Sequence, residues 1–188
     1  MLEKEVFYPE TIGDWRQWLL LNGTHKESVW VVFYKKDSGI PSISWSDAVD
    51  EALCFGWIDS KKIKIDDQKS HHYFGKRKAK STWSKINKDK IEKLLSENRM
   101  TASGLSCVNE AKKNGSWTML DEVEALILPK DLELAFQNNL EAYDFYQTLS
   151  KTSKKNILLS MVMAKQPITR QKRIDAIIEA SLQKKKLW

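Results

Sequence analysis

The stretch from Ser28 to Tyr34 constrains the fold of this chain most, because it is β-branched and aromatic almost throughout. A continuous apolar run of this length predicts a β-strand that is buried on both faces. The segment from Trp57 to Ile65 predicts a second, half-buried strand, because isoleucines and lysines alternate along its second half. Asp66-Asp67-Gln68 then predicts a hairpin connection, and His71 to Phe74 predicts the returning strand.

Most of the remaining sequence has the spacing of amphipathic helices. Thr11 and Ser44 each begin a pattern with an acid three residues later, which is typical of a capped helix start. Gly23 and Gly56 fit the ends of these two helices, and Trp45 is expected on the apolar face of the second. Beyond the hairpin we expect helices only, beginning at or near Asn87, Thr101, Pro129, Asn139, Thr152 or Ser153, and Thr169.

These patterns predict an α+β protein. Its first half would hold a small antiparallel sheet of about three strands with flanking helices, and its second half would be all-helical. The boundary is expected between Gly115 and Pro129, which gives a mixed subdomain over residues 1–117 and a helical subdomain over 118–188. With 188 residues in all, we expect the two to pack into one compact unit.

Composition indicates an ordinary soluble globular protein, with 41% hydrophobic and 30% charged residues. The N-terminus lacks the apolar core of a signal peptide, and no apolar run approaches the length of a membrane span, so we expect a cytoplasmic location. Cys54 and Cys107 form no metal-ligand spacing, and we expect neither a metal nor a cofactor. The net charge of +6 favours acidic partners, although it does not identify one.

The segment between Trp57 and Asn87 carries the candidate site. Residues 69–88 include seven basic residues and no acidic one, which indicates either an anion site or a solvated basic surface. Arginine grips phosphate or carboxylate with two parallel hydrogen bonds, and a helix N-terminus presents free N–H groups to the same kind of ligand. We expect a ligand site formed by Trp57, Asp59, Arg77, Ser81, Trp83, Ser84 and Asn87, within a basic patch of Lys76, Lys78, Lys80 and Lys85.

In that site the tryptophans would stack on a flat ligand or line a pocket, and Asp59 would orient Arg77. The plainer alternative is a solvated loop with two core tryptophans and a structural Asp59–Arg77 pair. A nucleic-acid-binding module that uses residues 69–88 is a second alternative, because basic and aromatic residues alternate there. A third is an enzyme of unknown reaction, with Cys54 as nucleophile and His71 or His72 as base, although no catalytic motif is complete.

Five blocks in this order are similar to the bacterial YdeI/OmpD-associated family over nearly the whole chain: residues 30–36, 48–59, 80–87, 100–105 and 164–174. The resemblance implies a role in bacteriocin protection, that is, in stress tolerance toward envelope-active cationic peptides, and association with a porin. It implies no established reaction or cofactor. The chain departs from the family in lacking an export signal, and an acid is missing from Pro167-Ile168-Thr169-Arg170. We therefore expect a tolerance factor that binds an anionic small molecule or a protein partner.

Overall fold

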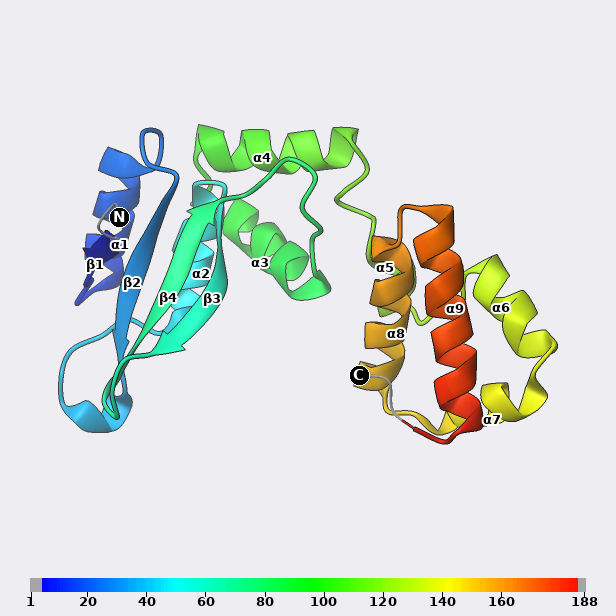
Figure 1. The fold of residues 1–188 in the computed structure, drawn as a ribbon. Helices are drawn as coiled ribbons and strands as arrows, with labels where there is room; N and C mark the ends of the chain where they lie inside the picture. The colour runs from blue at the N-terminus through cyan, green and yellow to red at the C-terminus, as the bar shows by residue number, and fades with distance from the viewer. Residues whose placement is uncertain (1–4, 186–188) are drawn as a thin grey trace. The chain divides into compact units, whose positions relative to one another are not determined.

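The computed structural model describes residues 5–185, and the chain divides into two compact units, residues 1–117 and 118–188. Figure 1 shows that every strand of the described residues belongs to the first unit and that the second is built from helices. The predicted α+β class is therefore confirmed. Across residues 5–185, no helix combines the length and the apolar character needed to cross a membrane.

The first unit contains a four-stranded mixed sheet in the order β1-β2-β4-β3. Strands β2 (Ser28–Tyr34), β3 (Trp57–Lys64) and β4 (Lys69–Lys76) are antiparallel, as predicted, but β1 (Val6–Phe7) adds a parallel edge strand beside β2. The expectation of about three antiparallel strands is corrected in this respect. A two-residue strand carries no recognisable alternation, so only its pairing reveals it.

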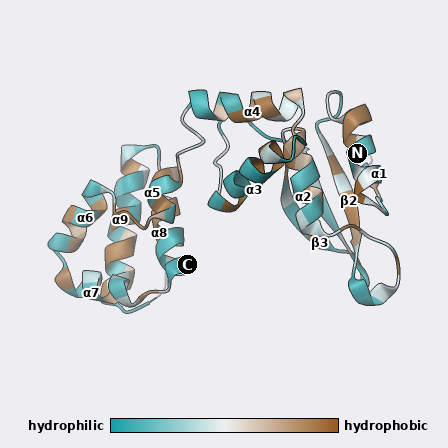
Figure 2. Ribbon diagram, turned by 180° about the vertical axis from the view of Figure 1, so that it is seen from behind, coloured by the Kyte–Doolittle hydropathy of each residue, from teal (hydrophilic) through white to brown (hydrophobic). Residues whose placement is uncertain are grey.

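One face of the sheet packs on α1 (Ile12–Asn22) and α2 (Trp45–Cys54), and Figure 2 shows α2 lying against the strands. Side chains alternate between the two faces of a strand, and the register places Val29 and Val31 on the same face as Phe74. The core on this face is rich in aromatic rings: Trp15 stacks on Trp18, and its indole N–H donates to the Ala48 carbonyl at 3.0 Å.

The predicted caps account for most helix starts of the first unit. The side chains of Thr11 and Ser44 cap α1 and α2, and Thr101 caps α4 (Ala102–Lys113). The expected start at Asn87 is wrong by one turn, because Ser84 is the cap of α3 (Lys85–Ser96) and accepts the backbone N–H of Asn87 at 3.3 Å. A 3₁₀ turn, η1 (Lys36–Ser38), follows β2.

The second unit contains α5 (Asp121–Glu124), α6 (Lys130–Gln137), α7 (Leu140–Thr148), α8 (Lys151–Met163) and α9 (Pro167–Leu182). The starts expected at Pro129 and Asn139 are confirmed. Helix α8 begins earlier than predicted, because Ser150 is the cap, and α9 begins at Pro167 rather than Thr169, since proline suits the first helical position. The short α5 was not predicted.

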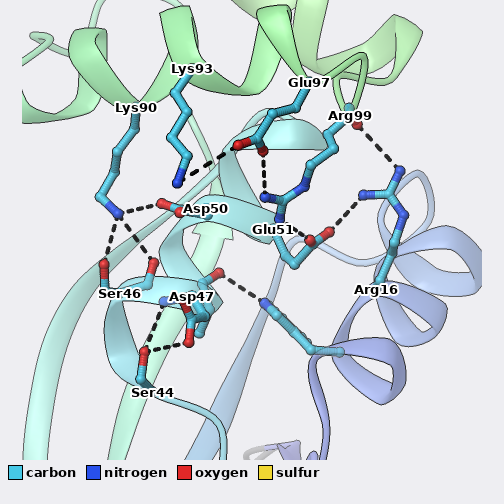
Figure 3. A network of polar contacts seen from close by, with 12 residues as sticks. Arg16, Ser44, Ser46, Asp47, Asp50, Glu51, Lys90, Lys93, Glu97 and Arg99 are labelled. Atoms are coloured by element: carbon cyan, nitrogen blue, oxygen red, sulfur yellow. Dashed lines mark hydrogen bonds and ion pairs between the residues drawn. The ribbon is translucent and has the colours of Figure 1, made fainter.

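A buried carboxylate organises the polar contacts of the first unit (Figure 3). Glu51 of α2 is 2% exposed, and its two oxygens pair with Arg16 of α1, at 2.6 Å, and with Arg99, which lies between α3 and α4. Arg16 also donates to the Arg99 carbonyl at 3.2 Å, and Glu97 receives a second N–H of Arg99 at 3.0 Å. Beside this cluster, Lys90 of α3 pairs with Asp50 of α2.

Replacement of Glu51 tests how much this cluster contributes. We expect Glu51→Gln to lower the free energy of unfolding by about 3 kcal/mol, because two arginines lose their common buried partner. Glu97→Gln is the matched control: it removes a carboxylate from the same Arg99 on the exposed side, and should cost at most about 1 kcal/mol. Urea unfolding measures both. Equal losses of unfolding free energy in the two variants would show that the buried Glu51 contributes no more to stability than the exposed Glu97.

Candidate functional site

A cavity of about 390 Å³ opens where three parts of the first unit meet. The α1–β2 connection contributes Gly23 and Thr24, and the α2–β3 turn contributes Phe55, Gly56 and Trp57. The end of β4 and the residues after it contribute Lys76, Arg77 and Ala79, and the remaining wall is one side of α4, namely Ser103, Ser106, Cys107 and Glu110.

Two glycines allow α4 to approach the end of α2. A Cβ atom on Gly104 would lie 2.2 Å from the carbonyl oxygen of Cys54, so a side chain there is incompatible with this packing. Gly56 has φ +75°, which favours glycine, and a Cβ there would lie 3.2 Å from the Cβ of Cys107. Thr101 fixes the approach, because its backbone N–H and its hydroxyl both donate to the Cys54 carbonyl, at 3.0 and 2.7 Å.

Arg77 is the main charged group of the cavity wall. Its backbone N–H donates to the carbonyl of Gly56 at 2.9 Å, which ties the end of β4 to the α2–β3 turn. Its guanidinium carbon lies 3.7 Å from the ring centre of Trp83, and one Nη donates to the Thr82 carbonyl at 2.5 Å. The Nε atom is buried without a hydrogen-bond acceptor, and among the described residues no carboxylate forms an ion pair with this guanidinium.

Burial lowers the pKa of Arg77 to about 10, with the charges of Cys107 and Asp59 acting in the opposite direction. The side chain is still a cation at neutral pH. Lys76 differs, because its ammonium donates to the Thr24 carbonyl at 3.1 Å and pairs with Glu27 at 2.7 Å. Arg77 is therefore the cation of the cavity that retains capacity for a negatively charged ligand.

The two predicted tryptophans are core residues. Trp57 and Trp83 are 0% and 2% exposed, so neither ring offers a free face for stacking on a ligand. Trp57 borders the cavity and donates its indole N–H to the Gly23 carbonyl at 3.2 Å. Trp83 packs against Trp117 with ring centres 5.0 Å apart, and its ring lies against the guanidinium of Arg77.

Asp59 does not orient Arg77, contrary to the prediction from the sequence. Its carboxylate accepts the indole N–H of Trp45 at 2.9 Å, and in residues 5–185 it forms no ion pair with Arg77. Trp45, expected to be buried, is 47% exposed, because it stands at the first position of α2 and reaches along the sheet edge to Asp59.

The other predicted residues serve local structure around the segment that follows β4. The Ser81 hydroxyl donates to the Lys78 carbonyl at 2.8 Å, while Ser84 and Asn87 form the α3 cap. None of these three residues borders the cavity described above. In the basic patch, Lys78, Lys80 and Lys85 are exposed.

The cavity residues of α4 were not anticipated from the sequence. Ser103, Ser106, Cys107 and Glu110 have the spacing i, i+3, i+4, i+7, which places them on one side of a helix. This spacing was a usable signal, but it does not say which helix side faces a cavity.

The proposed nucleophile and base are poorly suited to catalysis. Cys54 is fully buried, and burial, reinforced by the charge of Glu51, raises the pKa of its thiol to about 11. At neutral pH it is therefore protonated and a weak nucleophile. The sheet register places His71 and His72 on opposite faces. Within the described part of the chain, no cluster of three or more His, Cys, Asp or Glu side chains could hold a metal ion.

Comparison with protein families divides the chain in two. Residues 7–107 match a domain of unknown function, DUF8412, and residues 125–184 match the family described as "Bacteriocin-protection, YdeI or OmpD-Associated". The predicted resemblance to the YdeI/OmpD-associated family is thus confirmed for the second unit, but its expected extent is wrong, because the blocks before residue 107 fall in the other family. Neither the curated proteins nor the solved structures include a match. The first match covers more than half of the sequence, and so the chain belongs to the DUF8412 family, with a C-terminal segment similar to the bacteriocin-protection family.

Proposed function

We propose that this chain is a bacteriocin-protection-type protein whose first unit binds a small anionic ligand in the cavity beside Arg77. The match of residues 125–184 supports the protective role. The chemistry of the cavity supports the binding role. We assign the anion to this unit because Arg77, which lines the cavity, has a buried N–H without an acceptor and no ion pair among the described residues.

The observation that carries the binding proposal is the environment of the Arg77 guanidinium. A charge that is largely removed from water is costly unless it is paired. Here one buried N–H lacks an acceptor and no carboxylate of the described residues forms an ion pair with the guanidinium, although the charge of Asp59 offsets part of the effect of burial. An anion in the cavity would offset that cost. Trp83 holds the guanidinium plane in place, which reduces the entropy lost when a ligand binds.

The size of the cavity favours a small ligand over a nucleic acid strand. A volume of about 390 Å³ lies within the range of small-molecule sites. A nucleic acid would instead use the exposed lysines after β4, such as Lys78 and Lys80, and its affinity would fall steeply with salt. The two modes therefore depend on different residues within the same short segment.

Thermal unfolding tests this proposal. The unfolding temperature is measured with added inorganic phosphate or small carboxylates, at low and at moderate salt. We expect a saturable rise in the unfolding temperature with one of these classes, since a ligand that binds only the folded state stabilises it. Arg77→Ala should lower the affinity at least about tenfold, in line with the loss of hydrogen bonds to a charged group. Arg77→Lys keeps the charge and should recover only part of the affinity, because the planar fork is lost.

Lys80→Ala is the matched control, because Lys80 is exposed and lies three residues from Arg77. It should leave the affinity for the small anion unchanged. An equal loss in Lys80→Ala and Arg77→Ala, together with stabilisation by oligonucleotides that disappears as salt rises, would contradict the cavity proposal and favour nucleic-acid binding.

The protective role is tested by survival. We expect expression of the chain in a bacteriocin-sensitive bacterial strain to increase survival after exposure to the bacteriocin. If the anion site serves that role, Arg77→Ala should remove most of the increase, whereas Lys80→Ala, at the same expression level, should preserve it. Survival that does not change with the wild-type chain, across a panel of bacteriocins, would refute the protective role.

A further inference from the structure

We propose that the cavity ligand is a small zwitterion, with its anionic group at Arg77 and a primary ammonium at Glu110 of α4. This inference rests on the anion site proposed above and adds the second charge of the ligand. It is carried by a carboxylate that lines the same cavity as the unpaired guanidinium.

The wall formed by α4 carries the carboxylate of the proposed site. Cys107 packs against Gly56, whose carbonyl accepts the backbone N–H of Arg77 at 2.9 Å, so α4 lies beside the Arg77 segment at that level. Glu110 follows one turn later on the same side of the helix, which is about 4.5 Å further along the axis. The cavity thus holds a cation and a carboxylate in its lining, and its volume of about 390 Å³ suits a compact molecule such as an amino acid or an aminoalkyl phosphate.

The carboxylate of Glu110 is available for such a ligand. Within residues 5–185 it forms neither an ion pair nor a side-chain hydrogen bond, and its side chain is exposed. The nearby ammonium of Lys112 lies 5.2 Å from the ring centre of Trp117 and so is directed to another partner. A simple dianion in the cavity would be repelled by Glu110, whereas an ammonium on the ligand would convert that repulsion into attraction.

Two matched pairs of probes isolate the ammonium. O-phosphoethanolamine is compared with ethyl phosphate, and β-alanine with propionate, so that each pair shares its anionic group and differs in the amine. The two pairs also distinguish a phosphate from a carboxylate ligand. Calorimetric titration of the full chain should show that the amine-bearing member of at least one pair binds about fivefold more tightly, the scale of a partly exposed ion pair.

Glu110→Gln should abolish this preference and leave the affinity for ethyl phosphate or propionate equal or higher. Glu92→Gln, which removes an exposed glutamate of α3 that does not line the cavity, should retain the preference. If wild-type protein binds both members of each pair equally, the zwitterion proposal is overturned while the anion site stands. If it binds none of the four probes, the anion site fails as well. A loss of preference in Glu92→Gln equal to that in Glu110→Gln would also overturn the proposal, because general surface charge would then explain it.

Discussion

The arrangement of the first unit depends on one buried carboxylate, Glu51. Through its two oxygens it joins α1, by Arg16, to the segment between α3 and α4, by Arg99. The position of α2 is therefore fixed from two sides, and with it the Cys54 carbonyl that accepts both hydrogen bonds from Thr101. Since Thr101 begins α4, the wall of the cavity is placed by contacts that lead back to Glu51.

The charges of Glu51 and Arg77 are both largely removed from water, and they are compensated differently. Glu51 has two arginine partners within the protein, which offset part of the cost of its near-complete burial. Arg77 has an aromatic ring and a backbone carbonyl, but no carboxylate among the described residues. The carboxylate of Glu51 is paired without a ligand, and its contacts stabilise the fold. The arrangement around Arg77 is incomplete on its own, and this difference is the reason for assigning binding to the Arg77 cavity.

Local chemistry in the sequence was sufficient for much of the fold. The strand β2 has the bounds expected from its continuous apolar run, and the capping side chains of Thr11, Ser44 and Thr101 begin their helices as predicted. The failures occur where local signals are short or degenerate. Strand β1 is two residues long, and Ser84 and Asn87 are both good caps one turn apart, so spacing alone could not choose between them.

The candidate site was predictable only in part, for a physical reason. Its basic character and Arg77 followed from the charge run after β4. The other wall did not, because Cys107 and Glu110 line the same cavity as Arg77 only through the close approach of α4 to α2, which Gly56 and Gly104 permit. This approach depends on the space left by two glycines in distant segments, and the hydrophobic periodicity of the sequence does not predict it. The exposure of aromatic rings was likewise decided by tertiary packing, which buries Trp57 and Trp83.

The central claim, that the Arg77 guanidinium is an anion receptor, is tested most directly by its own Nε–H resonance. The signal would be followed in ¹H–¹⁵N spectra and assigned by its absence from Arg77→Lys. Because this N–H is buried, it should exchange slowly enough with water to be observed. The account predicts a saturable shift of this resonance as phosphate, or whichever small anion stabilises the protein, is added at moderate salt, and the same shift in Lys80→Ala. An unmoved Arg77 signal, with shifts confined to the exposed residues 78–85, would contradict it.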